Sequence, residues 1–322
     1  MNTHLLVCRA ADGLLRERHL VFLALHGLRP EPTVDLTVFI LDEAEQILAC
    51  GSLYHNVLKQ IAVSGQWEGE GLCAQIVSAL IEEAARSGHT HLFLYTKPQH
   101  RALFHSLGFH PIVSTGDMLM MENRRDGIAR FLAPIPRFEG GAGCIVCNCD
   151  PFTLGHRRLM ETASRQSANV YVFVLSAGGF FPPDVRLRLV REGVSDLKNI
   201  TVLPGSDYLV SPATFPTYFI KEEHTGKAQC ALDIALFSTV IAPALGITHR
   251  YVGEEPFDPV TRQYNEQMKQ ELPRHGITLC EIPRYRAISA SEVRRLIKGG
   301  ELTALNPLLP EVSYHECVRR FG

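Results

Sequence analysis

A short apolar run that ends in a turn and continues into an amphipathic segment constrains the fold of this chain more than any other feature. The run Cys144–Cys147 is typical of a buried parallel strand, and residues 148–156 then read Asn-Cys-Asp-Pro-Phe-Thr-Leu-Gly-His. From His156 onward, apolar residues recur at helical spacing. The sequence therefore predicts a strand, a turn and a helix, the repeating unit of α/β proteins with a parallel sheet.

The turn between this strand and this helix has the properties of an anion site. The free N–H groups at a helix N-terminus and the positive end of the helix dipole converge on one place, which suits a phosphate. His156 lies in the first turn of the expected helix, so its imidazole can donate to a phosphate oxygen there. Thr153 can cap the helix or bind the phosphate itself. An ordinary strand–turn–helix with an exposed histidine is the alternative for this segment alone.

Residues 288–294, Ile-Ser-Ala-Ser-Glu-Val-Arg, form a second candidate anion site. Ser289 and Glu292 have the spacing of a capping box, which predicts another helix start. The hydroxyl groups and the first N–H groups would face an anion, and Arg294 would supply a planar charge for phosphate. A capped surface helix is the alternative here.

Together, the two segments resemble the motifs of the nucleotidyltransferase superfamily, whose members attack the α-phosphate of a nucleoside triphosphate. Residues 153–156 resemble its H/T-x-G-H motif, and residues 288–294 resemble its C-terminal I-S-x-S-x-x-R element. Because both motifs occur in the order and rough separation of that superfamily, we expect its fold.

The composition excludes several classes of function. A net charge of −2 gives no electrostatic reason to expect nucleic acid or an anionic membrane as a partner. We expect no apolar run as long as the ~18 residues of a membrane span, and the N-terminus does not resemble a signal peptide.

Nine scattered cysteines indicate reduced thiols in the cytoplasm. The cluster Cys144, Cys147 and Cys149 invites a metal interpretation, but two of its members fall in the apolar strand, so no metal site is expected.

We expect two domains, with residues 1–133 and 142–322 separated by a Pro- and Gly-containing linker at 134–141. In the first domain we expect strands at 37–40, 47–53, 58–63 and 91–95, and the sequence Gln66-Trp67-Glu68-Gly69-Glu70-Gly71 precedes a helix. In the second, strands at 144–147, 170–175, 200–203, 250–252 and 277–282 alternate with helices at 185–192, 231–237 and 291–298. This alternation predicts a parallel sheet whose ligand site lies at the carboxyl ends of the strands.

The first domain resembles the GNAT acetyltransferase fold through Q-x-x-G-x-G at residues 66–71 and F-x-x-L-G-F at 104–109. In active members of that fold, the Gly-rich loop wraps the pyrophosphate of coenzyme A. Glu68 and Glu70 oppose such an anion here. We therefore expect a GNAT-like mixed α/β domain that does not transfer acetyl groups, in front of a Rossmann-like nucleotidyltransferase domain with a parallel sheet.

The two-domain order resembles the citrate lyase ligase family, as do residues 213–221, 242–250 and 252–257. The resemblance implies an ATP-dependent enzyme that adenylates acetate with Mg²⁺ and passes the acetyl group to the prosthetic-group thiol of the citrate lyase acyl carrier subunit. It implies catalytic roles for His156, Thr153 and Arg294, and a possible phosphate contact for Lys221. The nucleotide-binding positions that it implies are Asn148, Asp150, Phe152, Gly155, Gly253, Glu254, Ser289 and Ser291.

One departure from the family lies at residues 175–182, Leu-Ser-Ala-Gly-Gly-Phe-Phe-Pro, where charged residues are usual. A mobile, uncharged Gly-Gly loop is expected in their place, and the acid accepted or the activity may differ. Three alternatives therefore stay open. They are a free-standing nucleotidyltransferase that acts on a cofactor precursor, a GNAT acetyltransferase, and a catalytically silent partner of the lyase.

Overall fold

The chain forms two compact α/β units in a computed structural model, which describes residues 3–9, 13–31, 33–176, 178–209, 225–256 and 258–322. The first unit contains Met1–Arg130 and Pro216–Leu232, of which the structure describes 225–232, and the second contains Phe131–Phe215 and Asp233–Gly322. The first division thus falls at 130/131, near the expected end of the first domain. The sequence did not predict that a second stretch groups with the first unit.

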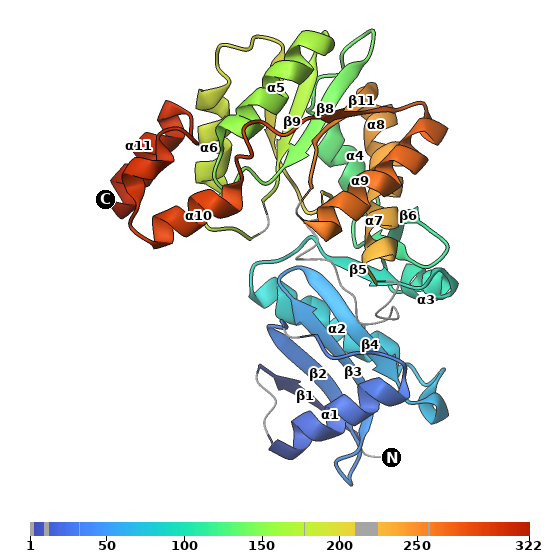
Figure 1. The fold of residues 1–322 in the computed structure, drawn as a ribbon. Coiled ribbons are helices and arrows are strands. Elements are labelled where there is room, and N and C mark those ends of the chain that lie inside the picture. The colour runs from blue at the N-terminus through green and yellow to red at the C-terminus, as the bar shows by residue number, and fades with distance from the viewer. Residues whose placement is uncertain (1–2, 10–12, 32, 177, 210–224, 257) are drawn as a thin grey trace. The chain divides into compact units, whose positions relative to one another are not determined.

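The first part of the chain contains a seven-stranded mixed sheet (Figure 1). Its elements are β1 His4–Cys8, α1 Gly13–Leu25, β2 Leu36–Leu41, β3 Ile47–Tyr54, β4 Val57–Val63, α2 Leu72–Arg86, β5 Phe93–Thr96, α3 Arg101–Ser106, β6 His110–Ser114, β7 Leu119–Glu122 and α4 Gly127–Leu132. The strand order is β1-β2-β3-β4-β5-β7-β6. Only β4 and β5 run parallel, and they pair at Val57–Phe93 and Leu58–Leu94. This order confirms the GNAT-like mixed α/β fold.

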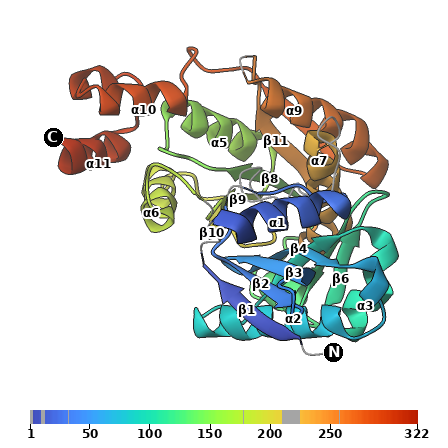
Figure 2. The same cartoon turned by 90° about the horizontal axis from the view of Figure 1, so that it is seen from below.

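Apolar residues on both faces of this sheet explain why helices cover it on both sides, as Figure 2 shows for α1 and α2. On one face, Ile76 and Leu80 of α2 pack in a buried cluster with strand residues such as Leu94. On the other face, Phe22 and Leu23 of α1 pack in a second cluster. Strands β2 and β3 are buried almost throughout, which is the expected pattern for a sheet enclosed between two layers.

The second part of the chain contains a five-stranded parallel sheet in the order β10-β9-β8-β11-β12. Its elements are β8 Ala142–Cys147, α5 Leu154–Gln166, β9 Val170–Val174, α6 Pro183–Gly193, β10 Ile200–Pro204, α7 Thr225–Leu236, a π-helix Phe237–Ile241, α8 Ala242–Leu245, β11 Ile247–Gly253, α9 Pro259–Glu271, β12 Thr278–Ile282, α10 Ala290–Lys298 and α11 Glu311–Phe321. The parallel, Rossmann-like sheet that the sequence predicts is confirmed.

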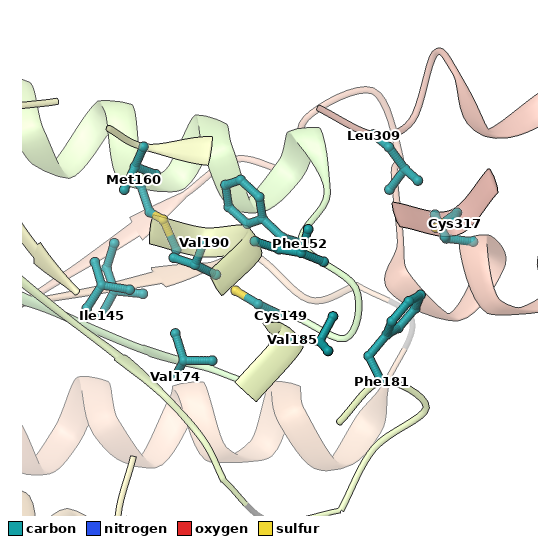
Figure 3. Close-up of a cluster of buried hydrophobic side chains, with 14 of the residues drawn as sticks. Ile145, Cys149, Phe152, Met160, Val174, Phe181, Val185, Val190, Leu309 and Cys317 are labelled. Carbon is teal, nitrogen blue, oxygen red and sulfur yellow. The ribbon is translucent and has the colours of Figure 1, made fainter. Parts of the chain in front are cut away.

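The core of the second unit joins its sheet to residues from α5, α6, α10 and α11. The cluster includes Ile145 and Val174 from strands, Met160 from α5, Val190 from α6 and Cys317 from α11. In Figure 3, Cys149 and Phe152 point into this cluster from the loop that follows β8. The loop that carries the first motif is therefore anchored to the core through Cys149 and Phe152.

The helical stretch Ala228–Leu245 is long and apolar enough to cross a membrane by length and composition, with a mean hydropathy of 1.6. The expectation that no apolar run approaches this length is therefore wrong. Half of the stretch is buried inside the protein, however, as in the core helix of a globular domain. All nine cysteines are free thiols, as the cysteine pattern indicates.

Candidate active site

The site lies where the order of the parallel strands reverses direction. Strand β8 is the first of its sheet in the sequence; β9 and β10 lie on one side of it, and β11 and β12 on the other. In open parallel sheets, ligands bind at the carboxyl ends of the strands that flank such a switch point. Asn148 directly follows β8, and Gly253 ends β11. Two segments that the sequence singled out thus flank the same crevice.

Thr153 and His156 form the start of α5. The Thr153 side chain accepts from the His156 N–H at 3.4 Å, and the His156 Nδ1 accepts from the Thr153 N–H at 3.1 Å. This is a capping box in which histidine takes the place of the usual Glu or Gln. The predicted cap at Thr153 is confirmed, and the reciprocal bond fixes the imidazole against the helix N-terminus.

The contacts of His156 also define its protonation. Because Nδ1 accepts from a main-chain N–H, the proton of the neutral ring lies on Nε2, which is then the donor. Burial, followed by the charge of Arg284, lowers the pKa of His156 to about 4, against an opposing effect of Asp150. The imidazole is therefore neutral near pH 7 and can donate one hydrogen bond without carrying a charge.

The second motif starts α10 beside the first. Ser289 caps this helix by accepting from the Glu292 N–H at 3.0 Å. The Glu292 carboxylate accepts instead from Arg295 at 2.8 Å, so the serine half of the expected capping box forms. The Ile288 carbonyl oxygen lies 3.8 Å from the place that a Cβ atom would take on Gly155. The two helix starts are therefore neighbours.

Arg294 connects the two motifs directly. Its Nη1 donates to the Asp150 main-chain oxygen at 2.5 Å, and its Nη2 donates to Ser291 Oγ at 3.1 Å. Arg294 Nη1 also lies 3.9 Å from Asp150 Oδ2. The guanidinium is partly exposed, so it can still reach a ligand above the crevice.

Asp150 and Phe152 contribute from beneath the site. The Asp150 carboxylate accepts from the N–H groups of Phe180 and Phe181 at 2.7 and 2.8 Å. The Phe152 ring has 0% exposure, packs where a side chain on Gly193 would clash, and stacks at 6.3 Å on His156. Both residues therefore shape the site by holding the loop, and neither side chain presents a free surface to a nucleotide.

A fully buried arginine, Arg186, organises this loop, and no sequence pattern had indicated it. It donates to the main-chain oxygens of Asn148 at 3.0 Å, Gly178 at 2.7 Å and Phe181 at 3.1 Å. The described residues of the stretch 175–182 are thus tied to a buried cation and to Asp150. The stretch itself carries no charge, as expected, and a buried cation lies beneath it at Arg186.

The remaining predicted positions follow strand ends or lie at a helix start. Asn148, Gly253, Glu254 and Ser291 are exposed. The main chain at the end of β11 is already fixed, because the Gly253 oxygen accepts from Asn265 and the Glu254 N–H donates to Ile282. Lys221 and the family-like residues 213–221 lie outside the described part of the chain.

The first unit contains a separate cavity of about 590 Å³ between the diverging ends of β4 and β5. Glu68, Gly69 and Gly71 line it, and Gly71, with a φ of 77°, caps α2 as the Gly-rich pattern predicts. Burial and then Lys97 lower the pKa of His100 at this cavity, and Glu68 opposes them. One carboxylate therefore faces the place where the fold would hold an anion.

No group of three or more His, Cys, Asp or Glu side chains with the geometry of a metal site occurs among the residues that the structure describes. Cys147 Sγ and Cys149 Sγ lie 3.0 Å apart at the base of the site. Burial raises the pKa of the Cys149 thiol well above its usual value, so this thiol is protonated and packs as a small apolar group.

The five-stranded parallel sheet and the two adjacent helix starts define a nucleotidyltransferase-like domain. Residues 142–316 match the family model of the citrate lyase ligase C-terminal domain. The chain is also 39% identical over 309 residues to citrate (pro-3S)-lyase ligase of Escherichia coli K12. This similarity covers 91% of this chain and 88% of that protein. The chain belongs to the citrate lyase ligase family.

Two further similarities each cover one part of the chain. Phosphopantetheine adenylyltransferase of Streptococcus pneumoniae is 28% identical over 164 residues, which is 49% of this chain and 85% of that protein. A putative acetyltransferase of Exiguobacterium has 17% identity and a TM-score of 0.32, over 41% of this chain and 99% of that one. The description of the first unit as GNAT-like therefore depends on its own sheet order.

Proposed function

We propose that this enzyme adenylates acetate with ATP and then acetylates the prosthetic-group thiol of the citrate lyase acyl carrier subunit. In the first step, an acetate oxygen attacks the α-phosphorus, the bond to the bridging oxygen breaks, and pyrophosphate leaves. In the second step, the thiol loses its proton and attacks the acetyl carbon, and AMP leaves. The cytoplasm is the compartment that we propose for this reaction.

The observation that carries this proposal is the convergence of two helix starts on one crevice, with His156 and Arg294 between them. Both N-termini offer main-chain N–H groups and dipole ends to an anion. In-line displacement at phosphorus needs charge stabilisation and positioning more than covalent help from the protein. A neutral donor and a fixed guanidinium at one switch point supply both.

Each residue has a distinct part in this scheme. His156 Nε2–H donates to the oxygen between the α- and β-phosphates as negative charge develops there. Thr153, Ser289 and Ser291 position the phosphates together with the N–H groups of their helices, and Arg294 neutralises them. Gly155 leaves room beside the capping threonine, and Gly253 and Glu254 border the base or ribose. Asp150 and Phe152 keep His156 and the loop in place.

Mg²⁺ fits this site as a companion of the triphosphate. Magnesium is commonly held by substrate phosphates together with one or two carboxylates and water. Asp150 is the carboxylate of the motif loop itself, but it already accepts hydrogen bonds from two main-chain N–H groups. We therefore expect the phosphate oxygens to provide most of the ligands, and the ion to offset phosphate charge when it is bound.

A second candidate is adenylyl transfer to a cofactor precursor, which the similarity to phosphopantetheine adenylyltransferase supports. Incubation with ATP, labelled acetate and deacetylated citrate lyase separates the two. Our proposal predicts label on the carrier subunit and equimolar AMP and pyrophosphate. Release of pyrophosphate with phosphopantetheine, without any labelled carrier, would favour the second candidate. Labelling with acetyl-coenzyme A alone would instead indicate an acetyltransferase.

A further inference from the structure

A second arginine approaches the site from the segment between β12 and α10. Arg284 Nη1 contacts Glu255 Oε1 at 2.8 Å, and the two side chains are 17% and 22% exposed. Arg284 follows the carboxyl end of β12, and Glu255 follows the carboxyl end of β11. This ion pair therefore lies at the edge of the sheet that holds the two motifs.

The charge of Arg284 reaches the imidazole that starts α5. After burial, Arg284 is the largest cause of the lowered pKa of His156, and its effect exceeds that of Asp150. The main chain agrees, because the Ile288 N–H donates to the Tyr285 oxygen at 3.0 Å and the Ile288 oxygen lies 3.8 Å from the place of a Cβ atom on Gly155, next to His156. Arg284 and Arg294 thus both lie close to the place where the phosphates would meet His156.

The backbone around Arg284 is held in an uncommon conformation. Arg286 and Ala287 follow one another with φ of 49° and 54°, a left-handed region that non-glycine residues avoid. A main-chain bond of 3.0 Å from the Ile288 N–H to the Tyr285 oxygen closes this turn, and Ile288 is buried. Strain of this kind often occurs at ligand sites.

Glu255 is fixed independently of the arginine. Its Oε1 also accepts from the Asp258 N–H at 3.2 Å, and Asp258 caps the start of α9. The carboxylate therefore stays at the edge of the crevice when the guanidinium moves. A single carboxylate is also a weaker partner for arginine than a polyphosphate that carries several charges.

We propose that Arg284 is a phosphate-binding residue of this site. Without a nucleotide it pairs with Glu255, and a bound triphosphate competes with Glu255 for its guanidinium. This inference depends on the proposed function, because it assumes that ATP binds at the switch point. It differs from the family motifs, since neither residue belongs to the segments 148–156 or 288–294. Arg284 would contact the β- and γ-phosphates, so its effect should grow with the number of phosphates.

The test is calorimetric binding of ATP and AMP to the full-length chain and its variants. Arg284→Gln should weaken ATP binding ~10-fold or more but AMP binding much less, and Arg284→Lys should retain part of the affinity. Glu255→Gln should tighten ATP binding several-fold, because it removes the competing carboxylate. Arg286→Gln is the matched control, since Arg286 is exposed on the same turn and stacks on Tyr285. Its ATP affinity should not change.

A second readout does not depend on binding affinity. NMR titration of His156 should show a higher pKa in Arg284→Gln than in the parent protein, and a further rise when ATP is added to the parent. If Glu255→Gln weakens ATP binding as much as Arg284→Gln does, the pair is structural and the inference is wrong. Equal losses for ATP and AMP would also overturn it. If the parent protein itself binds no ATP, the proposed function fails first.

Discussion

Arg294 donates to the main-chain oxygen of Asp150 across 144 positions of sequence, with Nη1 and the oxygen 2.5 Å apart. The bond links the helix that starts at the second motif to the loop that carries the first. Its second branch binds Ser291 Oγ at 3.1 Å, so the guanidinium plane is fixed from both sides. The two motifs therefore form one site, and the orientation of Arg294 depends on both of them.

Arg294→Lys should raise the KM for ATP and slow adenylation, because lysine keeps the charge but loses the planar fork. Loss of one charge-assisted bond is worth about 1.5–3 kcal/mol, which corresponds to roughly a 10- to 100-fold loss in kcat/KM. The requirement for acetate should persist, since we assign Arg294 to phosphate rather than to the acid. Steady-state pyrophosphate release at varied ATP and acetate measures both effects.

The same variant combined with His156→Ala should lose less than the product of the two single losses, because both residues act on one transition state. Independent, multiplying losses would contradict a shared site. A change in the acetate requirement alone would also contradict it.

Much of this site could be predicted because its signals are local. Capping residues in the segments 148–156 and 288–294 predict where two helices start. Thr153 and Ser289 cap α5 and α10 as expected. The strands of the parallel sheet were also predictable, because strands buried on both faces give continuous apolar runs. The strand order was not predicted, and it is this order, β10-β9-β8-β11-β12, that places the switch point at the end of β8.

Other features depend on tertiary packing that no local pattern reveals. Arg186 lies in the expected helix at 185–192, and an arginine is normally exposed, yet packing of α6 under the loop buries it completely. Strands β1, β6 and β7 were not predicted, and β1 is an exposed strand at the end of its sheet. Phe152 was assigned to the nucleotide pocket by motif position, but only the packing against Gly193 shows that it lies beneath.

His156→Ala should leave the melting temperature nearly unchanged while acetate-dependent pyrophosphate release falls ~10²-fold or more, as for loss of one well-placed donor. The Thr153 hydroxyl oxygen accepts from the main-chain N–H of residue 156, so this half of the capping box survives the change. Thermal unfolding and initial rates on the same preparation separate the two effects. An unchanged rate would remove His156 from the transition state.

Arg186→Met should destabilise the second unit, because the variant removes a buried cation and leaves the main-chain oxygens of Asn148, Gly178 and Phe181 without that partner. Breaking such a buried network costs about 3–5 kcal/mol. We expect a clear drop in melting temperature and a loss of ATP binding. Arg191→Met on the exposed face of the same helix is the control, and an equal drop there would argue against a specific role for Arg186.

The cavity of the first unit should bind acetyl-coenzyme A weakly or not at all, because Glu68 lines it and opposes the pyrophosphate. Calorimetry on the full-length chain measures this directly. Tight binding that is lost when Gly69 or Gly71 is replaced by valine would show that the loop is a working cofactor site, and would revive the acetyltransferase alternative. Both glycines have positive φ, so each replacement needs a melting temperature as its control.

The most direct test of the central claim is isotope exchange between labelled pyrophosphate and ATP, in the presence and absence of acetate and without citrate lyase. Adenylation of acetate at the switch point predicts exchange that requires acetate, saturates with it, and disappears in His156→Ala. Exchange that needs no acetate, or that appears only with phosphopantetheine, would contradict the account.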